Sequence, residues 1–397
     1  MAEVKNLIPF ARPFMDELEA QAASRVILSR WVTQGPEVAA FEKEFAAYVG
    51  ASYACAVSSC TTALHLALQA VGVRHGDEVI TVSHSFIATA NSIRYLGAIP
   101  VFVDIQRGTY NMDPSLVEAA ITSHTRAILC VHQIGMPCDL QRILEIGKRY
   151  GLPVVEDAAC AVGSEILWDG QWGRIGKPHG DIACFSFHPR KLLSTGDGGM
   201  LTTKNPAYDQ KFRLWRQHSM SVSDTKRHAS DQVIFEAYTE LGYNYRLTDI
   251  QAAIGREQLK KLPRIVSFRR EQVQRYIQML EGISGLGLPE EPVWARSNWQ
   301  SFCVRLPEGA DQRGVMQTLL DKGIPTRRGV MCAHREPAYP KGTWSCGMED
   351  CNCQPGSCQH LIQSEQAQDR AIMLPLFYEL TIMQQEQVTS ALLSCLR

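Results

Sequence analysis

The chain has 397 residues, with 40 Lys and Arg against 41 Asp and Glu, and a formal net charge of −1. This length exceeds one ordinary hydrophobic core, so we expect two domains. The basic residues are scattered, which excludes the basic surface that nucleic-acid binding requires. The sequence has no run of about 18 apolar residues for a membrane span, and its charged, proline-containing start differs from a secretory signal. We therefore expect a cytoplasmic protein.

The first two-thirds of the chain alternates short apolar runs with helical patterns. Apolar strands separated by helices are typical of a mostly parallel sheet that is covered on both faces. The helical patterns include residues 114–123 and 140–151. Strands are predicted at residues 53–58, 78–83, 100–105, 127–133, 153–158, 183–187 and 199–203.

From about Leu247 the pattern changes to a long amphipathic helix, predicted over residues 248–283 and expected to break near Pro263. A strand at 300–306, a helix at 312–323 and a final helix after Leu376 follow. These elements predict a smaller α+β domain. We therefore expect a large domain over residues 1–255 and a small one over 256–397, with a cysteine-rich loop at 346–360.

Polar residues follow several of the predicted strands. Ser59 is expected to cap a helix whose first free amides belong to Cys60 and Thr61, and such a helix start can bind an anion. Most N-caps bind nothing, so this segment alone also fits an ordinary capped helix. Ligands of parallel sheets bind beyond the carboxyl ends of the strands, where Ser59, Asp157 and Ser186 fall.

Asp157 ends the run PVVEDA, where a buried carboxylate needs a cationic partner. That partner is either a neighbouring Lys or Arg or a protonated pyridine nitrogen. Lys191 follows Ser186 by five positions, so one loop offers a hydroxyl to a phosphate and an amine to an aldehyde. Partial desolvation beside a cation is expected to lower the pKa of this lysine. The alternative is a solvated loop lysine, but the three strand-end signals together predict pyridoxal phosphate.

At these residues the chain resembles the vitamin B6-dependent sugar aminotransferases of the DegT/StrS type, within the fold-type-I, aspartate aminotransferase-like superfamily. The resemblance extends nearly end to end. Its motifs, in chain order, are WVTQGPEVAAFEKEF, SSCTTALHLAL, SFIATANS, YLGAIPVFVDI, VVEDAAC, CFSFHPRKLLSTGDGGM, GYNYRLTDIQAAIGREQL and GIPTRRGVMCAHREPAY.

This resemblance implies a large α/β domain with a mostly parallel seven-stranded sheet, and pyridoxal 5'-phosphate as cofactor, with pyridoxamine 5'-phosphate formed in the half-reaction. It implies that Lys191 holds the cofactor as a Schiff base and shuttles the proton, and that Asp157 pairs with the pyridine nitrogen. Phe86 would stack on the ring, although simple core packing is an equal alternative. The resemblance further implies cofactor-binding roles for a set of polar residues, namely Cys60, Thr61 and Ser186 at the phosphate and Cys160 beside the ring.

The resemblance assigns one residue to the site of the neighbouring subunit, and the chain departs from the family pattern at another. Asn244 matches the position that reaches the phosphate of the neighbouring subunit, which implies a homodimer with shared sites. Cys160 stands where many relatives carry Gln or His. Candidates for contacts to the donor carboxylate or to a sugar nucleotide are Arg246, His334 and Tyr339, together with Arg327 and Arg328. Each also fits a surface or domain-interface role.

The reaction that the resemblance implies is transfer of an amino group from L-glutamate or L-glutamine to a keto sugar. The sugar is expected to be nucleotide-linked, such as a 4-keto-6-deoxy or 3-keto hexose, although some relatives act on a keto-cyclitol. Other relatives dehydrate sugars, and these carry His in place of the lysine. A non-catalytic sensor would have lost Lys191 or Asp157, and both are present.

The cysteine-rich loop is unlike the rest of the resemblance. It holds four thiols and a histidine within 15 residues, and such a set can bind zinc. The spacing lacks the paired C-x2-C knuckles of strong zinc motifs. The sequence therefore favours an oxidisable or irregular loop, and we predict no metal site. The residues are Cys346, Cys351, Cys353, Cys358 and His360.

Overall fold

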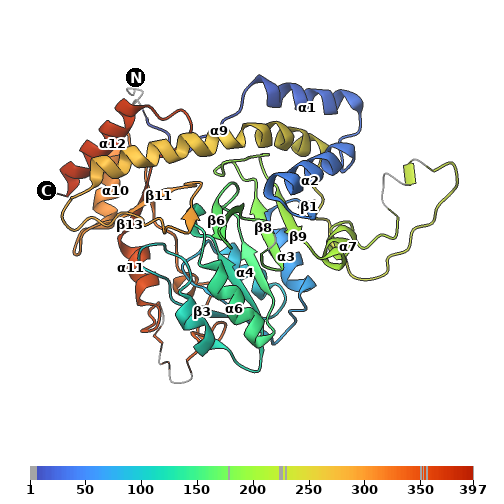
Figure 1. Ribbon diagram of the computed structural model, residues 1–397, viewed down its shortest axis with the longest axis horizontal. Coiled ribbons are helices and arrows are strands. Elements are labelled where there is room, and N and C mark those ends of the chain that lie inside the picture. The colour runs from blue at the N-terminus through green and yellow to red at the C-terminus, as the bar shows by residue number, and fades with distance from the viewer. Residues whose placement is uncertain are drawn as a thin grey trace.

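The structure is a computed structural model that describes residues 7–177, 179–222, 227–228, 230–348, 351, 353–354 and 356–396. A seven-stranded sheet forms the centre of its larger part (Figure 1). The strands are β1 (Tyr53–Val57), β2 (Glu78–Val82), β3 (Ile99–Val103), β4 (Thr125–Val131), β5 (Val154–Asp157), β8 (Ile182–Ser186) and β9 (Gly199–Thr203).

The strands lie in the order β1-β9-β8-β5-β4-β2-β3. Five of them are parallel to their neighbours from β8 to β3, and only β9 pairs antiparallel, with both β1 and β8. The predicted mostly parallel seven-stranded sheet is therefore confirmed. The carboxyl ends of β4, β5 and β8 meet at one edge of the sheet, because these three central strands run in the same direction.

Both faces of the sheet are buried, which explains why its strands lack polar alternation. Along β2, Val79 packs into the core on one face, whereas Ile80 and Val82 pack into the core on the other. Helices cover each face. The first face packs against α3 (Cys60–Ala70) and α7 (Pro206–Trp215), and the second against α2 (Pro36–Val49), α6 (Leu140–Tyr150) and α9 (Asp249–Leu280).

The long helix α9 connects the two parts of the chain. Figure 1 shows it running from α1 (Glu17–Ser29) and α2 to α12 (Ile382–Cys395). The predicted break near Pro263 is wrong, because the helix continues through this proline. Pro263 lies on the exposed side of the helix, where water can hydrogen-bond the carbonyl that proline leaves without a donor. The domain boundary expected at residue 255 therefore falls inside a continuous helix.

Another predicted helix, over residues 114–123, is shorter in the structure. It is a single turn, α5 (Pro114–Val117), followed by the 3-10 turn η1 (Glu118–Ala120). The helix α4 (Ala88–Arg94) follows β2 near the sheet edge where the site lies. A separate three-stranded sheet contains β6 (Glu165–Trp168), β7 (Gln171–Arg174) and β10 (Ala295–Arg296).

The C-terminal part has its own antiparallel sheet and hydrophobic core, as expected for a smaller α+β unit. Its elements are β11 (Phe302–Arg305), α10 (Gln312–Asp321), β12 (Arg327–Arg328), the 3-10 turn η3 (Ala333–Arg335), α11 (Ile362–Arg370), β13 (Ala371–Leu374) and α12. Within the described residues, no helix has the length and apolar character that crossing a membrane requires.

Candidate active site

A cavity of about 470 Å³ lies at the carboxyl ends of the central strands. Val131, Asp157 and Ser186, the last residues of β4, β5 and β8, all line it. The opposite wall comes from the C-terminal part, through β12 and the residues at 329–331 that follow it. The cavity therefore lies where strand-end loops of the large sheet face the smaller unit, a usual place for a ligand site.

Asp157 is buried at the base of this cavity. Its Oδ2 accepts a hydrogen bond from Thr89 Oγ1 at 2.7 Å, and its Oδ1 accepts one from the Ala159 amide at 3.1 Å. Within the described part of the chain, no Lys or Arg hydrogen-bonds to this carboxylate. Burial raises the pKa of Asp157, although these two hydrogen bonds and the charge of Lys191 oppose the shift. A cationic ligand group would satisfy the carboxylate.

Lys191 also lines the cavity, and its Nζ donates a hydrogen bond to Cys160 Sγ at 3.0 Å. The lowered pKa expected for this amine is wrong for the structure. Burial disfavours the charged ammonium, but interactions with Cys160, Cys60 and Asp157 outweigh it, so the pKa of Lys191 is raised. The sequence did not indicate that two thiols and a carboxylate would be the groups that raise the pKa of this amine.

The helix start at Ser59 has the geometry expected of a capped N-terminus. Ser59 Oγ accepts from the Thr62 amide at 3.2 Å, and Thr62 Oγ1 accepts from the Ser59 amide at 3.2 Å. Ser59, Cys60, Thr61 and Ser186 all line the cavity. The Cys60 thiol donates to the Cys184 carbonyl at 3.6 Å, which directs the sulfur toward β8 and leaves the backbone amide for a ligand.

Gly199 explains how this helix start fits against the sheet. A Cβ at this position would clash with the Ser59 carbonyl group and lie 2.7 Å from the Cys60 amide nitrogen. Only glycine therefore allows β9 to approach the first turn of α3 so closely. Gly199, in the glycine run after Lys191, is thus what lets the start of α3 lie against the sheet beside the cavity.

Two other predicted cofactor residues line the cavity. Phe86 is 63% exposed, so its ring is available to a ligand and is not part of the core. Cys160 lies beside Lys191, as the hydrogen bond between them requires. The arginines 327 and 328 also line the cavity, on the side opposite the strand ends.

The other four predicted residues do not line the cavity of this single chain. Asn244 is exposed and pairs with Gln217 in an isolated bridge, and Arg246 is half-buried nearby. Tyr339 is buried, and its hydroxyl donates to Asn91 Oδ1 at 2.7 Å. His334 is buried as well.

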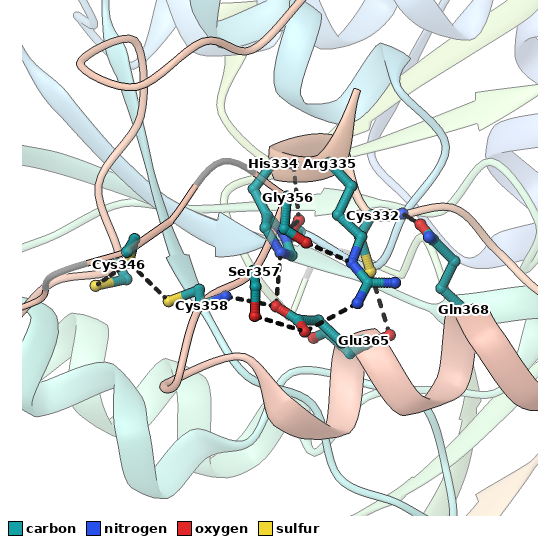
Figure 2. A network of polar contacts seen from close by, with 12 residues as sticks. Cys332, His334, Arg335, Cys346, Gly356, Ser357, Cys358, Glu365 and Gln368 are labelled. Carbon is teal, nitrogen blue, oxygen red and sulfur yellow. Dashed lines mark hydrogen bonds and ion pairs between the residues drawn. The ribbon is translucent and has the colours of Figure 1, made fainter. Parts of the chain in front are cut away.

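The two ring nitrogens of His334 are occupied by other side chains. Nδ1 lies 2.6 Å from Ser83 Oγ and Nε2 lies 3.1 Å from Glu365 Oε1. Figure 2 shows His334 directed toward Glu365. In this chain His334 therefore connects η3 to α11 and to Ser83, the residue that follows β2.

The structure adds residues to the cavity that the sequence analysis did not single out: His132, Gln133, Ile134 and Gln300. The Cys138 amide donates to His132 Nδ1 at 3.1 Å, so Nε2 carries the proton and donates to Glu156 Oε2 at 2.9 Å. Ile134 adopts a positive φ of 49°. The signal for the first two was present, because His132 and Gln133 are polar residues that end an apolar strand.

The residues that meet in this cavity fit pyridoxal 5'-phosphate. The decisive observation is Asp157, a buried carboxylate whose two protein partners are a hydroxyl and an amide. A protonated pyridine nitrogen would give it a cation. An amine and a glycine-lined helix start at the same cavity suit the aldehyde and the phosphate.

Comparison with known proteins agrees with this fit. A family model described as the DegT/DnrJ/EryC1/StrS aminotransferase family matches residues 13–393. The spore coat polysaccharide biosynthesis protein SpsC of Bacillus subtilis is 38% identical over 346 residues, covering 86% of this chain and 88% of SpsC.

Solved structures are also similar. DesV from S. venezuelae, solved with a ketimine intermediate, has a TM-score of 0.84 and 32% identity, covering 98% of this chain and 99% of DesV. The putative sugar aminotransferase Spr1654 from Streptococcus pneumoniae, in its PMP-form, has a TM-score of 0.87 and 25% identity over 98% of both chains.

Fold, cavity and relatives define one class of protein, the pyridoxal 5'-phosphate-dependent aminotransferases of the aspartate aminotransferase-like fold. Within that class, the chain belongs to the DegT/DnrJ/EryC1/StrS aminotransferase family.

Proposed function

We propose that this chain is a cytoplasmic enzyme of amino-sugar biosynthesis, which transfers the amino group of L-glutamate or L-glutamine to a nucleotide-linked keto sugar. The observation that carries the proposal is that Arg190, Arg327 and Arg328 line the same cavity as Lys191 and Asp157. Guanidinium groups suit the carboxylate of an amino donor and the phosphates of a sugar nucleotide. The names of SpsC and Spr1654 place those relatives in polysaccharide biosynthesis and among sugar aminotransferases.

Pyridoxal 5'-phosphate, when bound, supplies an electron sink that allows a proton to leave the carbon bearing the amino group. Asp157 would keep the ring nitrogen protonated, because an ionised carboxylate in a buried place favours a cation beside it. The amides of Cys60 and Thr61 and the hydroxyl of Ser186 would bind the phosphate at the start of α3.

Lys191 would hold the cofactor and then move the proton. Its Nζ is within reach of the cavity and is oriented by the hydrogen bond to Cys160. Released from the cofactor as an uncharged amine, Lys191 would accept the proton from the donor carbon and return it to the cofactor side. Phe86 would cover the ring and limit the entry of water.

The test follows the absorbance of the purified enzyme with bound cofactor. L-glutamate or L-glutamine alone should convert the spectrum to that of the pyridoxamine form, and a nucleotide-linked keto sugar should restore the first spectrum. No spectral change with any amino acid would contradict transamination. Recovery with a keto-cyclitol such as an inosose, and with no sugar nucleotide, would contradict the proposed acceptor.

We further propose that the enzyme is a homodimer with shared sites. The described residues between α7 and α9 extend away from the rest of the chain (Figure 1), and Phe235 there is 92% exposed. An exposed apolar arm of this kind is typical of a subunit contact. Asn244 lies on the same segment, outside the cavity of its own chain, so a neighbouring chain could receive it.

Mixed dimers test this arrangement. Lys191→Ala and Asn244→Ala chains should each be inactive or weak alone. After subunit exchange, about a quarter of the wild-type activity should appear, since half of the dimers are mixed and each mixed dimer has one intact site. A mixture that stays as inactive as its components, although mixed dimers form, would contradict sharing through Asn244.

A further inference from the structure

The cysteine loop, defined here as residues 346–358, gathers four sulfur atoms at one place. The Sγ atoms of Cys346, Cys351, Cys353 and Cys358 all lie within 4.8 Å of one another. Cys346 and Cys358 are buried and the other two are half-buried. None of the four lines the active-site cavity. The aminotransferase reaction therefore gives no reason for this convergence.

Two of the sulfur–sulfur separations match those around a single zinc ion, and a third is shorter. Sγ of Cys351 lies 3.8 Å from Sγ of Cys358, and Sγ of Cys353 lies 3.9 Å from Sγ of Cys346 and 3.1 Å from Sγ of Cys358. A tetrahedral zinc ion with Zn–S bonds of about 2.3 Å holds its sulfurs roughly 3.8 Å apart. An iron–sulfur cluster spreads its thiolates over several irons and so separates them more widely.

Cys351 and Cys353 are joined by a disulfide in the structure. One disulfide, however, does not explain why Cys346 and Cys358 also approach the same pair. Cys353 lies within 4 Å of all three other sulfurs. A soft, all-sulfur ligand set is the kind that zinc prefers.

The loop is held by the edge of the main sheet. Ser345 adds to edge strand β3, with the Phe102 amide donating to the Ser345 carbonyl at 2.7 Å and the Ser345 amide donating to the Pro100 carbonyl at 3.1 Å. Cys346 and Cys358 belong to a buried apolar cluster that includes Phe102 and Leu361. A metal site of fixed geometry needs surrounding residues that exclude water and hold the ligands in place.

Glu365 on α11 connects the cluster to the active-site wall (Figure 2). Its Oε1 accepts from the Cys358 amide at 2.6 Å, and its Oε2 accepts from Arg335 Nη2 at 2.9 Å. Arg335 Nε also donates to the Gly356 carbonyl at 3.0 Å. Arg335 ends η3, which directly follows the cavity-lining residues 327–331. The cysteine loop is therefore fastened to the segment that forms one wall of the cavity.

We propose that Cys346, Cys351, Cys353 and Cys358 bind one zinc ion as thiolates, in a structural site that fastens the wall of the cavity to the edge of the sheet. Binding replaces four thiol protons with one Zn²⁺ and involves no oxidation. The form that binds is the fully reduced chain, prepared with a phosphine reductant, since Cys351 and Cys353 must both be free. This proposal does not depend on the identity of the keto sugar or of the amino donor.

The experiment measures the metal content of the full-length, reduced protein after exposure to zinc chloride and gel filtration. We expect about one zinc per chain in the wild type and at least a fivefold lower content in Cys346→Ser and Cys358→Ser, since each loses a ligand. Cys395→Ser is the matched control, because this half-buried thiol lies on α12 and donates to the Ala391 carbonyl at 3.2 Å. Equal zinc in Cys358→Ser and in the control would overturn the proposal.

Cobalt binding by the wild-type protein tests the proposal even if a serine variant does not fold. Reduced, metal-free wild type titrated with cobalt chloride should develop the absorption of tetrahedral thiolate-bound cobalt and saturate at one equivalent, and zinc should displace it. Failure of the reduced protein to bind either ion would overturn the proposal. Isolation of the protein with iron and acid-labile sulfide would also overturn the proposal. Re-formation of the Cys351–Cys353 disulfide after reduction, in protein that then stays metal-free, would overturn it as well.

Discussion

The active-site cavity and the cysteine loop position their reactive groups in two different ways. In the cavity, Asp157 and Ser186 end strands that are neighbours in a rigid parallel sheet, so the sheet itself brings them together. In the cysteine loop, four thiols within 13 residues of sequence meet although none of the four cysteines lies in a helix or strand. The cavity groups should therefore keep their places when one of them is replaced, whereas each loop thiol should depend on the other three.

The largest effect is expected at Lys191, and it should be confined to chemistry. Lys191→Ala removes the amine that moves the proton and should lower turnover by about 10²- to 10⁴-fold. The far-ultraviolet circular dichroism and melting temperature should stay near those of the wild type, because the sheet does not depend on this side chain. Lys148→Ala, which changes an exposed lysine on α6, is the matched control. Wild-type turnover in Lys191→Ala would contradict the role of this lysine.

A smaller effect is expected when Asp157 keeps its shape but loses its charge. Asp157→Asn keeps one oxygen that can accept from Thr89 or from the Ala159 amide, and it gives up a charge-assisted contact, which contributes about 1.5–3 kcal/mol. Cofactor affinity should fall by roughly 10- to 150-fold, measured by titrating the cofactor-free protein. Unchanged affinity and turnover would show that the carboxylate does not pair with the ring nitrogen.

Most of the sheet could be predicted from sequence because each strand is a short apolar run bounded by polar or glycine residues. All seven predicted strands are present. The errors came from local rules that packing overrides. Pro263 does not break α9, because Leu262, Ile265 and Val266 bury that stretch of the helix. The helix predicted at 114–123 shortens to one turn, since the chain must turn into β4 soon after.

The cavity was predictable to the extent that its residues follow strands. The residues at the ends of β5 and β8 were found in this way, whereas Gln300 and Ile134 were not, because nothing local marks them as facing a cavity. His334 and Tyr339 show the opposite problem, since polar residues in a matching motif turned out to be buried in contacts with Ser83 and Asn91. The convergence of the thiols was also beyond the sequence, because none of the four cysteines lies in a helix or strand whose pattern would place it.

Beside the cysteine loop, Glu365→Gln tests whether the carboxylate is needed to hold η3 in place. The variant keeps the side-chain size but weakens the contacts to the Cys358 amide and Arg335, and we expect a loss of about 1–3 kcal/mol in local stability. Amide hydrogen exchange should accelerate by about 5- to 150-fold in residues 332–346, with little change in β4 or β5. Uniform acceleration throughout the chain would contradict a local role. Glu386→Gln, on α12, is the control.

The smallest expected effect is a loss of stability at acidic pH. It arises from a carboxylate beside the main sheet and not from the cysteine loop. Glu42 is buried on α2, where its carboxylate accepts from the Ala56 amide at 2.9 Å and from Arg213 at 2.7 Å and Arg216 at 2.5 Å. Burial alone would raise the pKa of Glu42, but the two arginines and the amide outweigh it and hold the pKa below its ordinary value of 4.5. The folded state therefore binds this proton less readily than the unfolded state.

The sign of the pH effect follows from that difference. The stabilisation by Glu42 is fully present above pH 4.5 and is lost as the pH falls toward the lower pKa of the folded state. Urea denaturation should show a nearly constant contribution from Glu42 to the free energy of unfolding between pH 7 and pH 5, and a decline below that. Glu42→Gln should be less stable than the wild type above pH 4.5 and should lose part of the decline below it, whereas Glu365→Gln should retain the decline. If Glu42→Gln declined as steeply as the wild type below pH 4.5, another carboxylate would have to explain the acid sensitivity of the sheet.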